Sequence, residues 1–532
     1  MDAAQIAAIT DVEVLRAALL DQVTLNVQHE AQIAKRDQAL AERDALIAKR
    51  EKTIHQRDIQ IEALTYEVAR LRRLQFSARS ERMDAEQRSL FDETIAADLA
   101  AAEAQLDALK REAQPASAPK QTPRRQALPA ELPRVTAVHE PDCHGCAQCG
   151  GELVKIGEHV RERLACKPIE FFVRREVFPQ YACRPCERIV AEPVPPAILD
   201  RSQADSSLLA QVTIAKYLDH LPLYRQEGIY ARSGVELSRS TLAEWIGAVG
   251  VALQPLVDAM RSELLSRSVL HADETPVAQL DPTAGKTKRA YLFAYRSADG
   301  PPIVVFDYCP SRSGEHARRF LSEWHGALMV DDYVGYKASF VEDRITELGC
   351  WAHARRKFVD LYKASKSPIA AEAIERIGQL YRIEREAADL DPDERTHWRQ
   401  THARPLLDAL HTWLQALHLQ VLGNSGTAKA IAYCLKRWTA LARYADNGRY
   451  PIDNNPIENA IRPVALGRKN WLFAGSETAG RRAAAIMSLL ATAKANQRDP
   501  HAWLNDVLNR LPTTKDRDIA TLLPHRWTSA SN

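Results

Sequence analysis

The sequence predicts a multidomain α/β protein. Three features support this fold class: a seven-residue repeat near the N-terminus, a block with paired cysteines, and a later series of short β-branched and aromatic runs. The 532 residues also exceed one ordinary hydrophobic core, and two proline-rich stretches divide them. We therefore expect a coiled coil, a metal-binding module and a mixed-sheet domain in one polypeptide.

The composition is that of a globular protein, with 45% hydrophobic and 26% charged residues. The net charge is only +2 at pH 7, but basic residues gather in segments 70–82 and 462–482. Local clusters on a nearly neutral chain indicate that a polyanion is bound at defined places. The first residues lack the pattern of a signal peptide and no apolar run is long enough for a membrane span, so we expect a cytoplasmic protein with reduced cysteines.

Apolar residues recur at every seventh position between 33 and 68, which predicts a long helix that forms a coiled coil. The second core position of the repeat is arginine in the early heptads and becomes leucine only at Leu64 and Leu71. We expect this helix to join chains into a homodimer or higher oligomer; the alternative is an isolated, highly charged helix. The seam consists of Ile33, Leu40, Ile47, Ile54, Ile61 and Val68.

The cysteine-rich block follows a proline-rich linker and ends at a second proline cluster, 193–196. It contains two C-x-x-C pairs that are separated by 33 residues (183 − 149 − 1). Four thiolates in this pattern bind one Zn²⁺ ion tetrahedrally, although the separation is longer than in a common zinc ribbon. The pairs are Cys146 with Cys149, and Cys183 with Cys186.

Neighbouring residues offer alternative ligands for the zinc ion. Cys143 extends the first pair to C-x-x-C-x-x-C, so Cys143 with Cys146 is an alternative first pair. His144 and His159 are possible substitute ligands. A further alternative is that the cysteines are buried thiols that bind no metal.

Segment 205–250 has apolar residues at helical spacing, which predicts short helices joined by tight turns. We expect Thr241 and Glu244 to form a capping box at the start of one helix. This pattern favours a helix-turn-helix-like DNA-binding region; a plain helical bundle is the alternative. The expected buried face of that helix holds Leu242, Trp245, Ile246 and Val249.

Segment 268–336 contains four short apolar runs, with a helical pattern between the third and the fourth. This order predicts a mixed sheet with a crossover helix. Asp273 interrupts the first run, and Asp331 and Asp332 end the fourth. Because a carboxylate on a buried strand is costly unless it is paired or binds a cation, these strands predict a site for Mg²⁺ or Mn²⁺.

Glu458 supplies a third carboxylate at the head of a basic and aromatic segment. We expect Asn455 to cap a helix and Pro456 to occupy its first position, so that Glu458 is either a metal ligand or a capping-box residue. The residues that follow favour the metal site, because they can hold phosphates and stack on a base. They are Arg462, Arg468, Lys469 and Trp471.

Segment 350–363 predicts a helix with one buried face and one face that contacts nucleic acid. His353 is a candidate phosphate or leaving-group contact, and the alternative is an ordinary hydrogen-bonded histidine. The expected buried face holds Trp351, Arg355 and Phe358, and the expected DNA-facing side holds His353, Arg356, Lys357 and Asp360.

Four motifs are long and specific: HADETP at 271–276, VDDYVGY at 330–336, CWAHARRKF at 350–358 and DNNPIENAIRPVALGRKNWLFAGS at 453–476. Together they resemble the transposases of the bacterial insertion-sequence-66 family, and the resemblance extends upstream through the cysteine block to the end of the heptads. It implies a DDE enzyme whose RNase H-like catalytic domain carries an α-helical insertion.

Taken position by position, the resemblance implies that Asp273, Asp331 and Glu458 are catalytic and bind the divalent ion, and that the four paired cysteines bind zinc. Asp332 stands where the family commonly has glycine. Since neighbours on a strand point to opposite faces, only one of the two adjacent aspartates should enter the site.

The implied function is that of a nucleoid-associated DNA transposase that binds terminal inverted repeats, cleaves the DNA and transfers the strand, with or without companion proteins. The alternatives are a DNA-binding protein without catalysis and a nuclease that cuts without joining. The expected parts are a helical oligomerisation region (1–112), a linker (113–142), the zinc module (143–196), the helical DNA-binding region (197–262), the catalytic core (263–365 and 451–490), the insertion (366–450) and a helical tail (491–532).

Overall fold

The computed structural model describes residues 202–281, 286–341, 344–421 and 425–528. It also describes 96–107, 132–140, 153–167 and 170–199 apart from 185, together with scattered residues within 17–71 and residues 128, 130 and 423. The chain divides into two compact units, one formed by Met1–Ala69 with Gln105–Ser117 and the other by Arg70–Ala104 with Ala118–Asn532. The elements below belong to the second unit unless stated otherwise.

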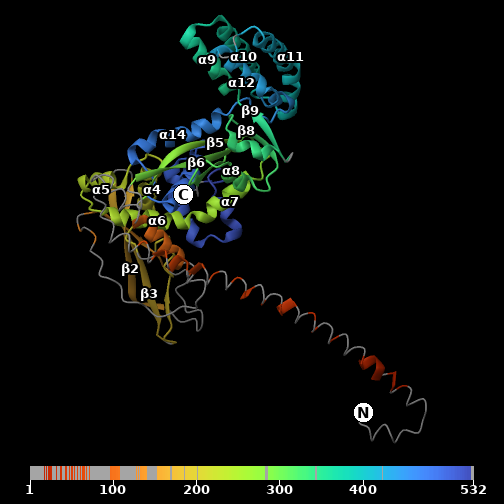
Figure 1. The fold of residues 1–532 in the computed structure, drawn as a ribbon. Helices are drawn as coiled ribbons and strands as arrows, with labels where there is room; N and C mark the ends of the chain where they lie inside the picture. The colour runs from red at the N-terminus through yellow and green to blue at the C-terminus, as the bar shows by residue number, and fades with distance from the viewer. Residues whose placement is uncertain are drawn as a thin grey trace. The chain divides into compact units, whose positions relative to one another are not determined.

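A five-stranded mixed sheet forms the centre of the second unit (Figure 1). Its order is β7-β6-β5-β8-β9; β5, β6 and β7 are antiparallel neighbours, whereas β8 runs parallel to β5 and β9 parallel to β8. The four predicted strands and the crossover helix α8 (Gly314–Leu321) are confirmed. The strands are β5 (Val269–Asp281), β6 (Lys286–Ser297), β7 (Val304–Cys309), β8 (Gly326–Val330) and the unpredicted β9 (Ile345–Gly349).

Helix α15 (Glu477–Ala495) covers the edge strand β7 with two buried hydroxyls. The N–H of Phe306 donates to Ser488 Oγ at 2.8 Å, and the N–H of Val304 donates to Thr492 Oγ1 at 3.0 Å. An edge strand otherwise presents unpaired backbone groups, so these side chains close this end of the sheet. Helix α14 (Asn455–Trp471) runs along β5 and β6 (Figure 1).

The predicted helical region before the sheet consists of α4 (Ser206–Tyr217), α5 (Leu223–Arg232), α6 (Arg239–Ala252) and α7 (Gln254–Leu264). The predicted buried face of α6 is confirmed, because Leu242, Trp245, Ile246 and Val249 are all buried. The predicted capping box is wrong: α6 begins three residues earlier, and Ser238 accepts the N–H of Thr241. Ser and Thr are both good caps, and the apolar pattern did not decide between them.

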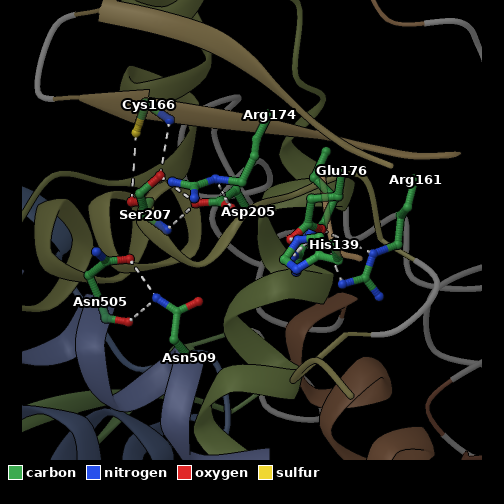
Figure 2. A network of polar contacts seen from close by, with 10 residues as sticks. His139, Arg161, Cys166, Arg174, Glu176, Asp205, Ser207, Asn505 and Asn509 are labelled. Carbon is green, nitrogen blue, oxygen red and sulfur yellow. Dashed lines mark hydrogen bonds and ion pairs between the residues drawn. The ribbon is translucent and has the colours of Figure 1, made fainter. Parts of the chain in front are cut away.

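A separate sheet contains a long β2–β3 hairpin, and both β1 and β4 pair with β3. Strand β1 lies within the segment predicted as a linker, 113–142, so the end of that segment belongs to this sheet. A polar network joins this hairpin to α4 (Figure 2). Asp205 caps α4 by accepting from Ser207 N–H, and it pairs with Arg174 at 3.1 Å. The Cys166 N–H donates to Ser207 Oγ at 3.2 Å, so both hairpin strands are tied to the same helix start. The strands are β1 (Arg134–Val138), β2 (Leu153–Lys167), β3 (Glu170–Cys183) and β4 (Ile189–Ala191).

The predicted helical insertion has its own core, in which helix α9 takes part. Trp351, Ala354 and Phe358 of α9 are buried there, whereas Arg355 is exposed. The predicted buried face of α9 was therefore right except for Arg355, in place of which Ala354 packs. The helices are α9 (Trp351–Ser365), α10 (Pro368–Glu386), α11 (Pro392–His418), α12 (Gly426–Lys436) and α13 (Trp438–Ala442).

The remaining described elements complete the second unit. Helix α16 (Pro500–Arg510) contacts α4. The short 3-10 helices are η1 (Val334–Phe340), η2 (Arg443–Asp446), η3 (Leu511–Thr513) and η4 (Asp516–Leu522). Within the described residues, no single helix is long and apolar enough to span a membrane. Helices α6 and α7, which form a bent pair, together have the length and composition of such a span.

The predicted heptad seam is only partly described. Ile47, Ile61 and Val68 are helical; Ile47 is exposed and Val68 is buried. The other seam positions, Ile33, Leu40 and Ile54, lie outside the described residues. Pairing of this helix with a second copy stays a prediction.

Candidate active site

Two of the predicted carboxylates lie close beyond the paired part of two adjacent parallel strands. The register of β5 and β8 ends at the pair of His271 and Met329. Asp273 follows His271 by two residues on β5, and Asp331 is the first residue after β8. Asp331 Oδ1 accepts the N–H of Tyr333 at 2.8 Å, which turns the chain and holds the carboxylate at the strand end.

Burial and neighbouring charge act together on Asp273. Its pKa rises from 3.8 to about 8, first because of burial and then because of the charge of Glu274, with smaller effects of Asp331 and Glu458. The N–H of Glu274 donates to Asp273 Oδ1 at 2.8 Å and opposes this rise only in part. An arrangement that disfavours ionisation to this degree is typical of a site that binds a cation.

Glu458 lies in the first turn of α14 and faces helix α9. Its Oε2 accepts from Arg356 at 3.2 Å, and its Oε1 lies 3.6 Å from Nδ1 of His353. The expected cap is displaced by one residue: Asn454, not Asn455, precedes the helix, and no side chain caps it. The two basic residues of α9 thus hold Glu458 beside the sheet.

Asn454 is fully buried and fastens the start of α14 to strand β5. Its Oδ1 accepts from Nδ1 of His271 at 2.9 Å, and its Nδ2 donates to the carbonyl of Ala272, also at 2.9 Å. Burial lowers the pKa of His271 to about 4, so the ring is neutral. Since Ala272 precedes Asp273, Asn454 links the elements that carry two of the three carboxylates.

Sequence reasoning missed Asn454 and also Glu274. The Glu274 side chain is 1% exposed, accepts from Arg312 Nε at 2.9 Å, and accepts the hydroxyl of Tyr336 at 3.1 Å. The signal was present in HADETP as a second carboxylate on the same buried strand. Its partner Arg312 lies 38 residues away, so no local pattern reveals the pair.

Asp332 differs from its neighbour Asp331 in its contacts. It accepts from Arg437 of the helical insertion at 2.6 Å and lies 3.5 Å from Lys337. Although burial acts to raise the pKa of Asp332, hydrogen bonding and the charges of these two basic residues lower it. Asp332 is therefore an ionised partner of a buried arginine, whose side chain is 2% exposed.

The predicted DNA-contacting residues fall into two groups. Arg356, Lys357, Arg462 and Lys469 are exposed. By contrast, Arg468 donates to the carbonyl of Pro276, and Trp471 lines a cavity of about 80 Å³ with His220 and Phe473. The expected basic surface therefore has fewer free members on α14 than the sequence suggests.

The two cysteines of the second predicted zinc pair lie at the end of the β2–β3 hairpin. Cys183 is buried, and its N–H donates to the Arg188 carbonyl at 2.9 Å, which closes the turn that contains Cys186. The register pairs Cys183 with Leu153, and Cys149 precedes Leu153 by four positions (153 − 149). The start of β2 and the end of β3 therefore lie side by side at one end of the hairpin. This arrangement fits a zinc ion shared by two cysteine pairs that are 33 residues apart in the sequence. Cys146, Cys149 and Cys143 lie outside the described residues.

Four models of one protein family match stretches of this chain. The model described as "Transposase IS66 family" matches 201–482, which includes the sheet, the insertion and α14. The "zinc-finger binding domain of transposase IS66" matches 144–187, which includes both cysteine pairs and begins after Cys143. "Transposase C of IS166 homeodomain" matches 63–136, and the "IS66 C-terminal element" matches 488–525.

Similar proteins come from Sinorhizobium fredii. Uncharacterized protein y4qI is 37% identical over 519 residues, which cover 94% of each chain. Uncharacterized protein y4jD is 37% identical over 415 residues, with 75% of this chain and 81% of the relative covered. Uncharacterized protein y4hP is 35% identical over 499 residues, with 88% and 90% covered.

Replacing Asn454 with alanine should lower the free energy of unfolding by about 2–3 kcal/mol, because His271 and the Ala272 carbonyl lose their buried partner. Urea titration measures this change. Asn470→Ala is the matched control: Asn470 is exposed on the same helix and should change stability by less than about 0.5 kcal/mol. Equal effects of the two substitutions would contradict the role assigned to Asn454.

Asp273→Asn should stabilise the metal-free protein. The folded-state pKa of Asp273, about 8, is far above the ordinary 3.8, so ionisation of this group favours unfolding increasingly as the pH rises through that window. In EDTA, the variant should gain several kcal/mol near pH 8, up to about 5 kcal/mol at about 1.36 kcal/mol per pKa unit, and almost nothing near pH 4. Asp360→Asn, at an exposed position of α9, is the control. A gain that does not depend on pH would argue against buried charge as the cause.

Proposed function

The chain belongs to the insertion-sequence-66 family of transposases, and we propose that it is a DNA transposase of the DDE type whose catalytic carboxylates are Asp273, Asp331 and Glu458. The observation that carries this proposal is the placement of Asp273 on β5 and of Asp331 directly after the adjacent parallel strand β8. The negative charges of Asp331 and Glu458 both act to raise the pKa of Asp273, which supports a site formed by these three groups. We assign the five-stranded sheet as the RNase H-like core.

The three carboxylates supply the ligand chemistry of a divalent cation, although oxygen atoms from all three do not lie within 4.8 Å of one another here, so one ion bound by all three would draw the side chains closer together. Oxygen ligands are those that Mg²⁺ and Mn²⁺ prefer, and Glu458 Oε1 is a buried oxygen without a hydrogen-bond partner. When bound, such an ion supplies Lewis-acid chemistry for attack on a phosphodiester. Asp273, Asp331 and Glu458 would hold it, and Arg356 keeps the Glu458 carboxylate oriented.

Exposed cations lie on the two helices that carry His353 and Glu458. Arg356 and Lys357 project from α9, and Arg462 and Lys469 project from α14. We assign them to contacts with the DNA backbone, which position the strand without reading its sequence. His353, also on α9, would contact the phosphate or the leaving group. Arg468 and Trp471 would shape this surface, because both side chains already contact the sheet or line the neighbouring cavity.

The proposed reaction has two phosphoryl-transfer steps. In the first, a water oxygen bonds to the phosphorus at the end of the element and the 3′ oxygen leaves as a hydroxyl. In the second, this 3′ hydroxyl attacks a target phosphodiester and displaces a target 3′ oxygen. The number of phosphodiester bonds is unchanged in the second step, and no covalent bond to the protein is needed.

The other modules would recognise and pair the DNA ends. We assign binding of terminal inverted repeats to the zinc module and helices α4 to α6, and pairing of two chains to the heptad region. Two paired chains would hold both element ends in one complex, with companion proteins where these are required. Such a protein would work at the nucleoid in the cytoplasm.

Substitutions of the neighbouring residues Asp331 and Asp332 test the assignment of the catalytic carboxylates most directly. Asp331→Asn should lower strand transfer by at least about 100-fold, because even outer-shell changes at metal sites cost 10–100-fold. Asp332→Asn should retain strand transfer but lose on the order of 1 kcal/mol of stability, because buried Arg437 loses its closest carboxylate. The assay uses a labelled element-end duplex, a plasmid target and Mg²⁺ or Mn²⁺, with urea titration of both variants.

The products separate the proposal from its alternatives. Joined product with wild type, absent for Asp273→Asn, Asp331→Asn and Glu458→Gln, supports a transposase. Cut but unjoined ends would instead indicate a nuclease. Specific end binding without cutting or joining, with every added factor, would indicate a DNA-binding protein whose carboxylates are structural.

Zinc content should depend on the paired cysteines and not on Cys143. We expect about one Zn²⁺ per wild-type chain by elemental analysis, and its loss in Cys146→Ser and Cys183→Ser. Cys143→Ser should retain zinc, because the family match begins at the next residue. Loss of zinc in Cys143→Ser, with retention in Cys149→Ser, would show that Cys143 and Cys146 form the first pair.

A further inference from the structure

Cys350, His353 and Glu458 form a group of metal-binding side chains beside the proposed catalytic centre. Cys350 directly precedes α9, His353 lies in the first turn of that helix, and Glu458 lies in the first turn of α14. One potential ligand atom from each residue lies within 4.8 Å of the other two. Among the residues that the structure describes, this is the one such group of at least three His, Cys, Asp or Glu side chains.

Two of these side chains present unsatisfied atoms to each other. His353 Nδ1 and Glu458 Oε1 lie 3.6 Å apart, and neither of these buried atoms has a hydrogen-bond partner. Buried polar atoms in native proteins are almost always satisfied by protein, water or an ion. A single cation bound by both atoms would satisfy them together.

The thiol of Cys350 is held in place by the backbone. The side chain is fully buried, and its sulfur accepts the N–H of Asn454 at 3.2 Å. Because Asn454 is fastened to β5 by two further hydrogen bonds, the sulfur sits on a rigid part of the fold.

We propose that Cys350, His353 and Glu458 bind a borderline-soft transition-metal ion such as Zn²⁺. Sulfur, nitrogen and oxygen are all ligands that Zn²⁺ accepts, and three protein ligands leave a fourth position for water or a phosphate oxygen. Mg²⁺ and Mn²⁺ prefer oxygen ligands, so this site discriminates against the proposed catalytic ion. Binding converts the thiol to a thiolate and releases its proton to solvent.

The site shares Glu458 with the proposed catalytic centre. This consequence rests on the proposed function: a Zn²⁺ ion held by Cys350 and His353 would occupy the carboxylate that the Mg²⁺ site needs. Zinc would then inhibit strand transfer in competition with Mg²⁺. The zinc module, whose ligands are four other cysteines, would be unaffected.

Cobalt absorption tests the site independently of activity. The full-length chain, with its cysteine module already loaded with zinc, is titrated with Co²⁺ while the thiolate-to-cobalt charge-transfer band is recorded. We expect a saturable band in wild type, its loss in Cys350→Ser, and a fall in Co²⁺ affinity of at least about 10-fold in His353→Ala. Cys434→Ser, which removes a fully buried thiol from α12, is the control and should retain the band.

The outcomes distinguish the two proposals. An unchanged band in both Cys350→Ser and His353→Ala, or none in wild type, overturns the metal site. If Cys350→Ser fails to fold, as judged by circular dichroism, His353→Ala decides, since that side chain is partly exposed. In strand-transfer assays, added Zn²⁺ should inhibit the wild-type protein less strongly as the concentration of Mg²⁺ is raised. A band without such inhibition overturns the competition, whereas a band with no strand transfer under any condition overturns the proposed function alone.

Discussion

The burial of the Asp273 carboxyl group on β5 is the constraint around which this part of the molecule is arranged. Burial, followed by the negative charge of Glu274, raises the pKa of Asp273 to about 8. A buried carboxyl group of this kind destabilises the fold when it ionises, so the surrounding structure must keep its strand in place. The buried bonds of Asn454 to His271 and Ala272 do this, because they fasten the start of α14 to the strand that carries Asp273.

In each of two pairs of adjacent acidic residues, one residue belongs to the proposed metal site and the other binds side chains that support the site. On β5, Asp273 belongs to the carboxylate cluster, whereas Glu274 accepts from Arg312 and Tyr336. Directly after β8, Asp331 accepts the N–H of Tyr333, whereas Asp332 binds Arg437. Successive residues of a strand point to opposite faces, which separates the side chains of Asp273 and Glu274 on β5. Through Tyr336, Glu274 links η1 to the sheet, and through Arg437, Asp332 links the insertion to the end of β8.

The sequence predicted the parts of the fold that depend on local pattern. Four strands, the crossover helix and the buried face of α6 follow from apolar spacing, and the structure has them. Strand β9 was missed because ITELG is short and carries a threonine and a glutamate. The cap of α6 was misplaced because two good capping residues stand three positions apart. Asn454 could not be assigned, since its partner His271 lies 183 residues away.

The length of chain between Asp331 and Glu458 gives no measure of their separation in space. The predicted insertion packs together with α9 in one core, so the helical insertion of the structure includes α9. It leaves the sheet after β9 and returns before α14, and its two ends lie side by side: the N–H of Trp351 donates to the Ile452 carbonyl at 3.1 Å. One residue before Trp351, the sulfur of Cys350 accepts the N–H of Asn454. With its ends joined in this way, the insertion can vary in length without moving Glu458. It nevertheless contributes to the site, because α9 supplies His353 and Arg356 to Glu458, and Arg437 binds Asp332. A helical insertion that only lengthened the chain would require neither contact, so we infer that it also orients the carboxylates of the site.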